Sequence, residues 1–181
     1  MNVLIGMPGC GKSTIGRLLA RRLNIPFFDS DHAIEQRLGE PIRAYFEREG
    51  ESAFRDLEEA VLRDLLRPAA GDAVVATGGG AVLRPANREH MRTAAQVIYL
   101  RATPEDIFRR VRNDTKRPLL QVGNPLEKLH ELYRVRDPLY RETAHFVVET
   151  ARASTAAVVN LITMQLEQAH LAQPAAPDNL A

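Results

Sequence analysis

Short apolar runs alternate along the chain with longer segments in which apolar residues recur every three or four positions. The short runs are typical of buried strands, whereas the periodic segments are typical of amphipathic helices. This alternation predicts an α/β protein with a parallel sheet covered by helices on both faces. The expected strands are residues 2–5, 26–29, 73–76, 97–100 and 145–148. Helices are expected at 12–23, at 31–38, at 41–66 with an interruption near Gly50, beyond Pro85, from Thr103, at about 126–141 and at 155–170.

The length of 181 residues suits one domain. We expect a single domain over residues 1–172 and a frayed tail over residues 173–181, which hold few large apolar side chains. The long connection between the second and third strands is expected to contain an inserted substrate-binding region at about residues 31–60. A second connection, about residues 111–125, is rich in Asn, Asp, Gly and Pro and is expected to act as a moving lid.

Charge and cysteine content narrow the range of partners. The formal net charge is +1, so no overall field attracts nucleic acid or a membrane surface. No apolar run is long enough to span a bilayer. Arginine makes up 21 of the 24 basic residues, and its planar guanidinium suits bidentate recognition of phosphate and carboxylate. Because Cys10 is the single cysteine, no intrachain disulfide can form, and we expect a cytoplasmic monomer that binds small molecules.

The segment Gly6–Ser13 reads G-M-P-G-C-G-K-S and fits the phosphate-loop pattern G-x-x-x-x-G-K-S/T. It follows an apolar strand and opens a helical segment, so backbone N–H groups and the helix dipole would converge on one anion. Lys12 would reach the β- and γ-phosphates of a nucleotide, and the Ser13 hydroxyl would ligate Mg²⁺. The alternative is an ordinary glycine-rich turn. The residues expected to contact the nucleotide here are Gly9, Cys10, Gly11, Lys12, Ser13 and Thr14.

Two further polar clusters come directly after expected strands, at the edge where parallel sheets bind ligands. Asp29 and Asp31 flank Ser30, so one carboxylate can hold a metal ion through its water shell while the other orients or deprotonates an alcohol. A helix N-cap is the alternative for either residue. The run Gly78–Gly80 leaves backbone N–H groups open to a closely approaching ligand, although a flexible turn has the same composition.

Two absences from the sequence argue against other classes of phosphate-loop protein. The chain has no N-K-x-D motif, with which GTPases recognise guanine. It also has no long apolar strand ending in Asp-Glu, as helicases and transporters do. The sequence therefore favours a kinase over a switch GTPase or a motor ATPase.

Six motifs resemble, in their order and spacing, those of the shikimate kinase family, from Asn2 to about residue 168. They read G-M-P-G-C-G-K-S-T-I-G, F-F-D-S-D, F-R-D-L-E-E, T-G-G-G, K-R-P-L-L and R-D-P-L-Y-R-E-T-A. The resemblance implies a three-layer P-loop kinase fold, similar to nucleoside monophosphate kinases, with a five-stranded parallel sheet of order 2-3-1-4-5. It also implies transfer of the γ-phosphoryl group of ATP, with Mg²⁺, to the 3-hydroxyl of shikimate, on the path to chorismate and the aromatic amino acids.

On the nucleotide side, the resemblance leaves the phosphate-loop lysine and serine in the roles given above. Asp29 matches a carboxylate that helps to hold magnesium through water. Arg117 matches a lid arginine that reaches the phosphates. Arg110 matches a residue that stacks on adenine, with the loop near Arg152 on the other side, where this chain departs from the proline of some relatives.

On the acceptor side, Asp31 matches the carboxylate that binds the substrate hydroxyls and is the candidate base, and Gly78, Gly79 and Gly80 match a backbone wall beside the substrate ring. Arg55 and Arg136 match the pair that clamps the shikimate carboxylate, since two guanidinium forks give both charge and orientation. Glu58 follows Arg55 by three residues on an expected helix and can brace it. Two residues after Arg136 a proline is expected to bend or end its helix.

Two other interpretations stay open at this point. A different small-metabolite kinase of the same fold, such as a gluconate or nucleotide kinase, would share the phosphate loop, although the two arginines and Asp31 favour shikimate. A nucleotide-dependent switch or regulatory ATPase with a protein partner would bind ATP without acceptor-dependent turnover. That second alternative leaves the pairing of Asp29 with Asp31 unexplained.

Overall fold

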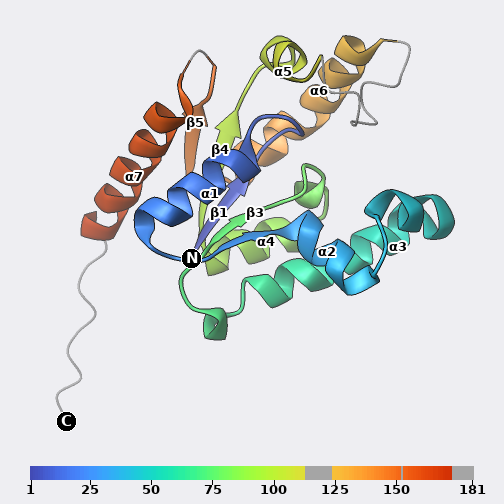
Figure 1. Ribbon diagram of the computed structural model, residues 1–181, viewed down its shortest axis with the longest axis horizontal. Helices are drawn as coiled ribbons and strands as arrows, with labels where there is room; N and C mark the ends of the chain where they lie inside the picture. Colours follow the sequence, from blue (N-terminus) through green and yellow to red (C-terminus); the bar gives the residue numbers. More distant parts are fainter. Residues whose placement is uncertain (113–123, 152, 173–181) are drawn as a thin grey trace.

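The computed structural model describes residues 1–112, 124–151 and 153–172, which form a five-stranded parallel sheet with helices on both faces (Figure 1). The strand order β2-β3-β1-β4-β5 confirms the expected sheet. The strands are β1 (Asn2–Ile5), β2 (Phe27–Asp29), β3 (Val74–Ala76), β4 (Gln96–Arg101) and β5 (Phe146–Glu149). The helices are α1 (Lys12–Leu23), α2 (Ser30–Leu38), α3 (Ile42–Leu65), α4 (Pro85–Ala94), α5 (Pro104–Val111), α6 (Pro125–Thr143) and α7 (Thr155–Ala172), with single 3₁₀ turns η1 (Pro68–Ala70) and η2 (Ala81–Leu83).

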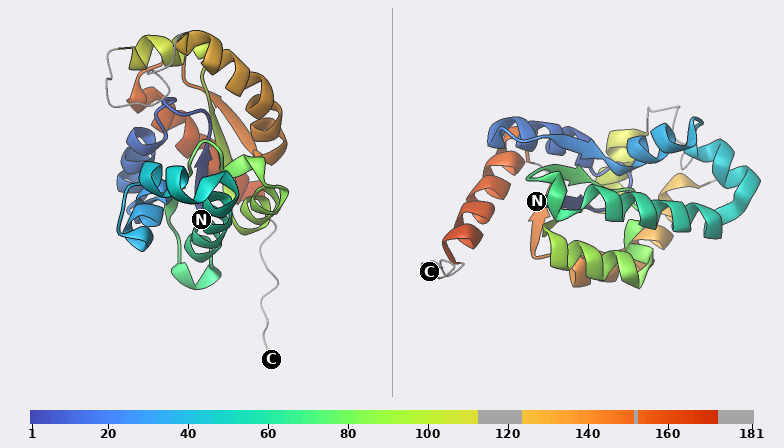
Figure 2. Two further views of the ribbon diagram at one scale, coloured as in Figure 1. Left: turned by 90° about the vertical axis from the view of Figure 1, so that its right-hand side faces the viewer. Right: turned by 90° about the horizontal axis from the view of Figure 1, so that it is seen from below.

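The helices form two layers around the sheet. α1 packs beside α7 on one face, and α4 packs beside α3 and α6 on the other (Figure 2). Side chains of all five strands contribute to the main core between these layers, and those of Val3–Ile5 in β1, of β3 and of the centre of β4 are fully buried. None of the helices in the described ranges has both the length and the apolar character that a bilayer crossing requires.

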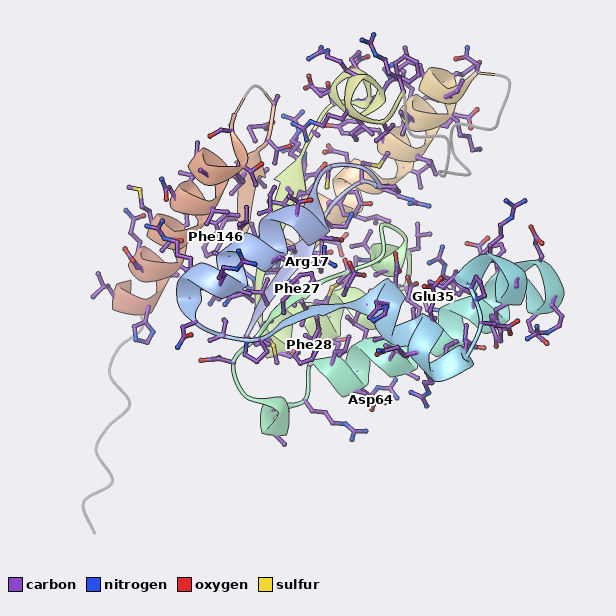
Figure 3. All side chains as sticks on the ribbon, in the orientation of Figure 1. Arg17, Phe27, Phe28, Glu35, Asp64 and Phe146 are labelled. Atoms are coloured by element: carbon purple, nitrogen blue, oxygen red, sulfur yellow. The ribbon has the colours of Figure 1, made fainter. Side chains whose placement is uncertain are left out.

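α1 lies close against β2. A Cβ atom at Gly16 would lie 2.5 Å from the Phe27 ring, so only glycine allows this approach. The guanidinium of the next residue, Arg17, lies 5.1 Å from the centroid of the same ring (Figure 3). This close packing brings the start of α1 and the end of β2 to the same edge of the sheet.

The register of the central strands places the polar clusters side by side. Asp29, the last residue of β2, pairs with Ala76, the last residue of β3. β1 in turn pairs with β3 and ends at the phosphate loop. Because the three strands run parallel and end together, Asp29–Asp31, Thr77–Gly80 and Gly6–Ser13 meet at one edge.

α2 and α3 form a separate projection from the sheet (Figure 1). The expected interruption of α3 lies at Gly50, whose φ of 83° and ψ of 176° are not helical. The projection has its own small apolar cluster of Ile34, Phe54 and Val61. This cluster supports the two helices where they extend past the main core.

α6 continues through Pro138 to Thr143, close to the expected range of about 126–141, so the proline does not end this helix. The final turn is held by burial: Tyr140 and Thr143 are fully buried, and the Thr143 hydroxyl donates to the Leu139 carbonyl at 2.6 Å. Packing therefore outweighs the backbone hydrogen bond that proline removes. The central part of the expected lid and the expected C-terminal tail lie outside the described residues.

Candidate active site

The phosphate loop joins β1 to α1 with the geometry of an anion cradle. Gly9 and Gly11 have φ angles of 84° and 103°, which side chains other than glycine rarely adopt. Gly11 is the N-cap of α1 and offers no side chain to the first N–H groups of the helix. These N–H groups and the positive end of the helix dipole are thus directed at a ligand in the loop.

Lys12 places a cation inside this cradle. Its ammonium donates to the Gly6 carbonyl at 2.8 Å and to the Met7 carbonyl at 3.0 Å, and the residue is only 9% exposed. A phosphate entering the loop would meet this charge directly.

Ser13 and Asp29 form an oxygen pair beside the loop. The Ser13 hydroxyl donates to Asp29 Oδ2 at 2.6 Å. Asp29 Oδ1 also accepts from the Asp31 N–H at 3.1 Å, so Asp29 is the N-cap of α2 as well. A hydroxyl and a carboxylate at hydrogen-bond distance fit Mg²⁺, which prefers few protein oxygens and several waters.

Asp31 faces the run Gly78–Gly80, which we call the glycine wall. A Cβ at Gly78 would lie 2.6 Å from Asp31 Oδ1, so a side chain there would displace the carboxylate. Asp31 is an exposed residue, but the partial burial of its carboxyl raises its pKa, and the charge of Asp29 raises it further. The cations of Lys12 and Arg55 oppose this shift. A carboxylate between such groups is suited to hold the proton of an alcohol.

Arg55 lies against the other end of the glycine wall. Its Nη1 donates to Glu58 Oε2 at 2.6 Å, which confirms the expected brace, and its Nη2 lies 3.3 Å from Glu51 Oε1. The side chains of Arg55 and Glu58 are 13% and 2% exposed. A Cβ at Gly80 would lie 2.5 Å from the Arg55 guanidinium. Burial raises the pKa of Glu58, and the cation of Arg55 opposes that shift.

Arg136, on α6, lies near the Arg55–Glu58 pair. It is partly buried, and its charge acts to lower the pKa of both Glu58 and Tyr140, so the guanidinium lies close to both side chains. Phe46 and Phe54 form an apolar pair nearby, with ring centroids 5.5 Å apart, and the Phe54 ring also contacts Arg55. Arg55 and Arg136 thus both lie beside the Glu58 carboxylate.

A hollow of about 230 Å³ borders the phosphate loop at Cys10, Gly11 and Thr14. Arg110 of α5 borders it, donating to the Cys10 carbonyl at 3.2 Å and to the Thr150 carbonyl. Thr150 and Val158 also border this hollow, and neither stands in a sequence motif that would have identified it. The lining residues are Cys10, Gly11, Thr14, Ile15, Arg110, Thr150, Ala153, Thr155 and Val158.

Two expected site residues, Arg117 and Arg152, lie outside the described residues. The structure therefore brings together the phosphate loop, the Asp29–Asp31 pair, the glycine wall and the arginines at positions 55, 110 and 136. This arrangement defines the class of P-loop kinases that phosphorylate small molecules.

Comparison with known proteins identifies the family. The family model "Shikimate kinase" matches residues 8–167. The chain is 59% identical over 172 residues to the shikimate kinase of Paracidovorax citrulli, covering 94% of both chains. It is 54% identical to that of Ralstonia nicotianae, covering 95% of this chain and 90% of the relative. The structure titled "Shikimate kinase from Acinetobacter baumannii in complex with shikimate" matches with a TM-score of 0.84 and 42% identity over 95% of both chains. The chain belongs to the shikimate kinase family, as its motifs predicted.

Proposed function

We propose that this protein transfers the γ-phosphoryl group of ATP to the 3-hydroxyl of shikimate, giving shikimate 3-phosphate and ADP. The observation that carries the proposal is the placement of Arg55 and Asp31 at opposite ends of one glycine wall. A molecule with a carboxylate at one end and a hydroxyl at the other fits between them. Membership of the family supports the same reaction, and the relative from A. baumannii binds shikimate.

On the nucleotide side, the loop N–H groups and Lys12 hold the phosphates of ATP. Ser13 and Asp29 would hold Mg²⁺, which would supply positive charge where the phosphates carry negative charge. The hollow beside Arg110 would take the adenine ring, and its contact with the phosphate loop supports this assignment. The phosphate contact expected of Arg117, the adenine contact expected of Arg152, the monomeric state and the cytoplasmic location stay predictions.

On the acceptor side, Arg55 and Arg136 bind the carboxylate and so fix the ring. Asp31 accepts a hydrogen bond from the 3-hydroxyl and directs its oxygen at the γ-phosphorus. Phosphoryl transfer requires little covalent chemistry from the protein, so positioning and charge neutralisation provide most of the rate enhancement. Closing the site to water would prevent hydrolysis of ATP.

A coupled assay of ADP release with Mg-ATP tests the proposed function. Shikimate, gluconate and nucleoside monophosphates are compared as acceptors. We expect ADP release that depends on shikimate. Equal turnover of gluconate would overturn the choice of acceptor, and ATP binding with no acceptor-dependent turnover would indicate a switch ATPase instead.

Arg136→Lys is expected to raise the KM for shikimate about tenfold, because an ammonium cannot replace a planar fork in a charge-assisted pair. The KM for ATP should stay constant. Steady-state kinetics with each substrate varied in turn measure both constants. Arg134→Lys, on an exposed residue of the same helix, is the matched control. A constant KM for shikimate in Arg136→Lys would remove Arg136 from the carboxylate clamp.

Gly80→Ala is expected to weaken shikimate binding with little change in Tm. The backbone at Gly80, with φ of −95°, accepts alanine, but the new methyl group would displace the Arg55 guanidinium. Moving the end of a long side chain costs little stability, whereas the carboxylate site loses its alignment. Calorimetric titration with shikimate measures the effect, and the affinity for ATP is the internal control. Unchanged shikimate affinity would contradict the placement of Arg55.

A further inference from the structure

One carbonyl of the glycine wall is held by a distant part of the chain. The Gly78 carbonyl accepts from the N–H of Ala81 at 3.1 Å, within the same turn. The Gly79 carbonyl instead accepts from the hydroxyl of Tyr140, on α6, at 2.6 Å. The activity described above gives Tyr140 no role.

This hydrogen bond also determines the direction of a neighbouring donor. In a trans peptide, the carbonyl of one residue and the N–H of the next point in opposite directions, and the described residues contain no cis peptide. Fixing the Gly79 carbonyl toward α6 therefore directs the Gly80 N–H away from α6. Gly80 is buried, yet no described residue accepts a hydrogen bond from its N–H. A backbone N–H needs an acceptor, so a donor in the glycine wall that no described residue satisfies is available to an oxygen atom of a ligand.

A peptide between two glycines needs such a restraint. Neither residue has a Cβ to oppose rotation of the peptide plane, so the plane can turn at little cost. Tyr140 is suited to hold it, because its ring is fully buried and packs on Tyr99 with centroids 4.9 Å apart. Burial raises the pKa of Tyr140, so its hydroxyl keeps the proton that it donates.

We propose that Tyr140 is a positioning residue for the acceptor site. By holding the Gly79 carbonyl, it directs the Gly80 N–H, beside Arg55, at an oxygen atom of shikimate. Tyr140 also follows Arg136 by one helical turn, so the same bond joins the helix of the carboxylate clamp to the glycine wall. This inference rests on the proposed function.

Tyr140→Phe tests the role, because it removes the hydroxyl and keeps the packed ring. We expect the KM for shikimate to rise about fivefold, which corresponds to the loss of one neutral hydrogen bond. The KM for ATP should not change. Tyr99→Phe is the matched control: it removes the partner ring's hydroxyl, which donates to Asp137 Oδ1 at 2.7 Å, and should leave both KM values unchanged. A purely structural role of Tyr140 would lower the Tm of Tyr140→Phe without a selective rise in the KM for shikimate.

The amide signal of Gly80 in NMR spectra is a second readout. It can be measured on the wild-type protein even if Tyr140→Phe folds poorly. Titration with shikimate should shift this signal strongly, and Tyr140→Phe should reduce the shift. An unchanged Gly80 signal on shikimate binding, or equal KM values for shikimate in wild type and Tyr140→Phe, would overturn the inference. Wild-type protein without any turnover of shikimate would overturn the proposed function instead.

Discussion

Lys12→Met is expected to reduce kcat about a thousandfold, because the ammonium neutralises charge that develops on the transferred phosphoryl group. The ammonium already lies within the loop, bonded to two of its carbonyls, so no large movement is needed to meet a phosphate. Methionine keeps the approximate length of the side chain and removes the charge. Coupled measurement of ADP release at saturating shikimate gives kcat.

Lys128→Met is the matched control for this prediction. Lys128 is an exposed residue of α6 that pairs with Glu131 at 2.9 Å. Its replacement should leave kcat within twofold of wild type, as is usual for surface ion pairs. Near-normal kcat in Lys12→Met, with Tm unchanged, would refute the assignment of the phosphate loop.

Asp31→Asn is expected to reduce kcat about a hundredfold or more while leaving the affinity for ATP unchanged. The amide can no longer accept the proton of the 3-hydroxyl or attract it by charge. ATP affinity should be preserved because Asp31 faces the glycine wall, whereas the phosphates lie in the loop. Steady-state kinetics together with calorimetric titration by ATP separate the two effects.

The same variant should not lose stability at neutral pH. The pKa of Asp31 is raised in the folded protein, so the folded state binds this proton more tightly than the unfolded state. Stability therefore falls as pH rises from the unfolded value of about 3.9 through the folded pKa, and the cost is fully present above it. Asparagine removes this cost, so Tm at pH 7 should equal or exceed that of wild type. Asp64→Asn, at an exposed ion pair with Arg37, is the control. A lower Tm together with unchanged kcat would show that Asp31 has a structural role.

The meeting of the phosphate loop with Asp29 and Asp31 could be predicted because each of these segments is local. Gly6–Ser13 is one continuous segment whose backbone forms the site, and Asp29 and Asp31 come directly after a strand. The parallel register then brings these segments to one edge, as it does in any sheet of this kind. The contact of Glu58 with Arg55 could also be predicted, because a spacing of three residues on a helix places the two side chains next to each other.

The remaining contacts join residues that are far apart in the sequence. Tyr140 reaches Gly79 across 61 positions, and Arg110 reaches Cys10 across 100. No periodicity encodes such pairs, since they depend on how α5 and α6 pack on the sheet. Pro138 does not end α6, although the sequence allowed for an end there, because burial of the last helical turn is a tertiary effect.

A crystal structure with shikimate and a non-hydrolysable ATP analogue tests the central claim most directly. The account predicts the polyphosphate along residues 6–13, the shikimate carboxylate between Arg55 and Arg136, and the 3-hydroxyl beside Asp31. Either compound bound at another place, or shikimate with its carboxylate turned away from both arginines, would contradict it.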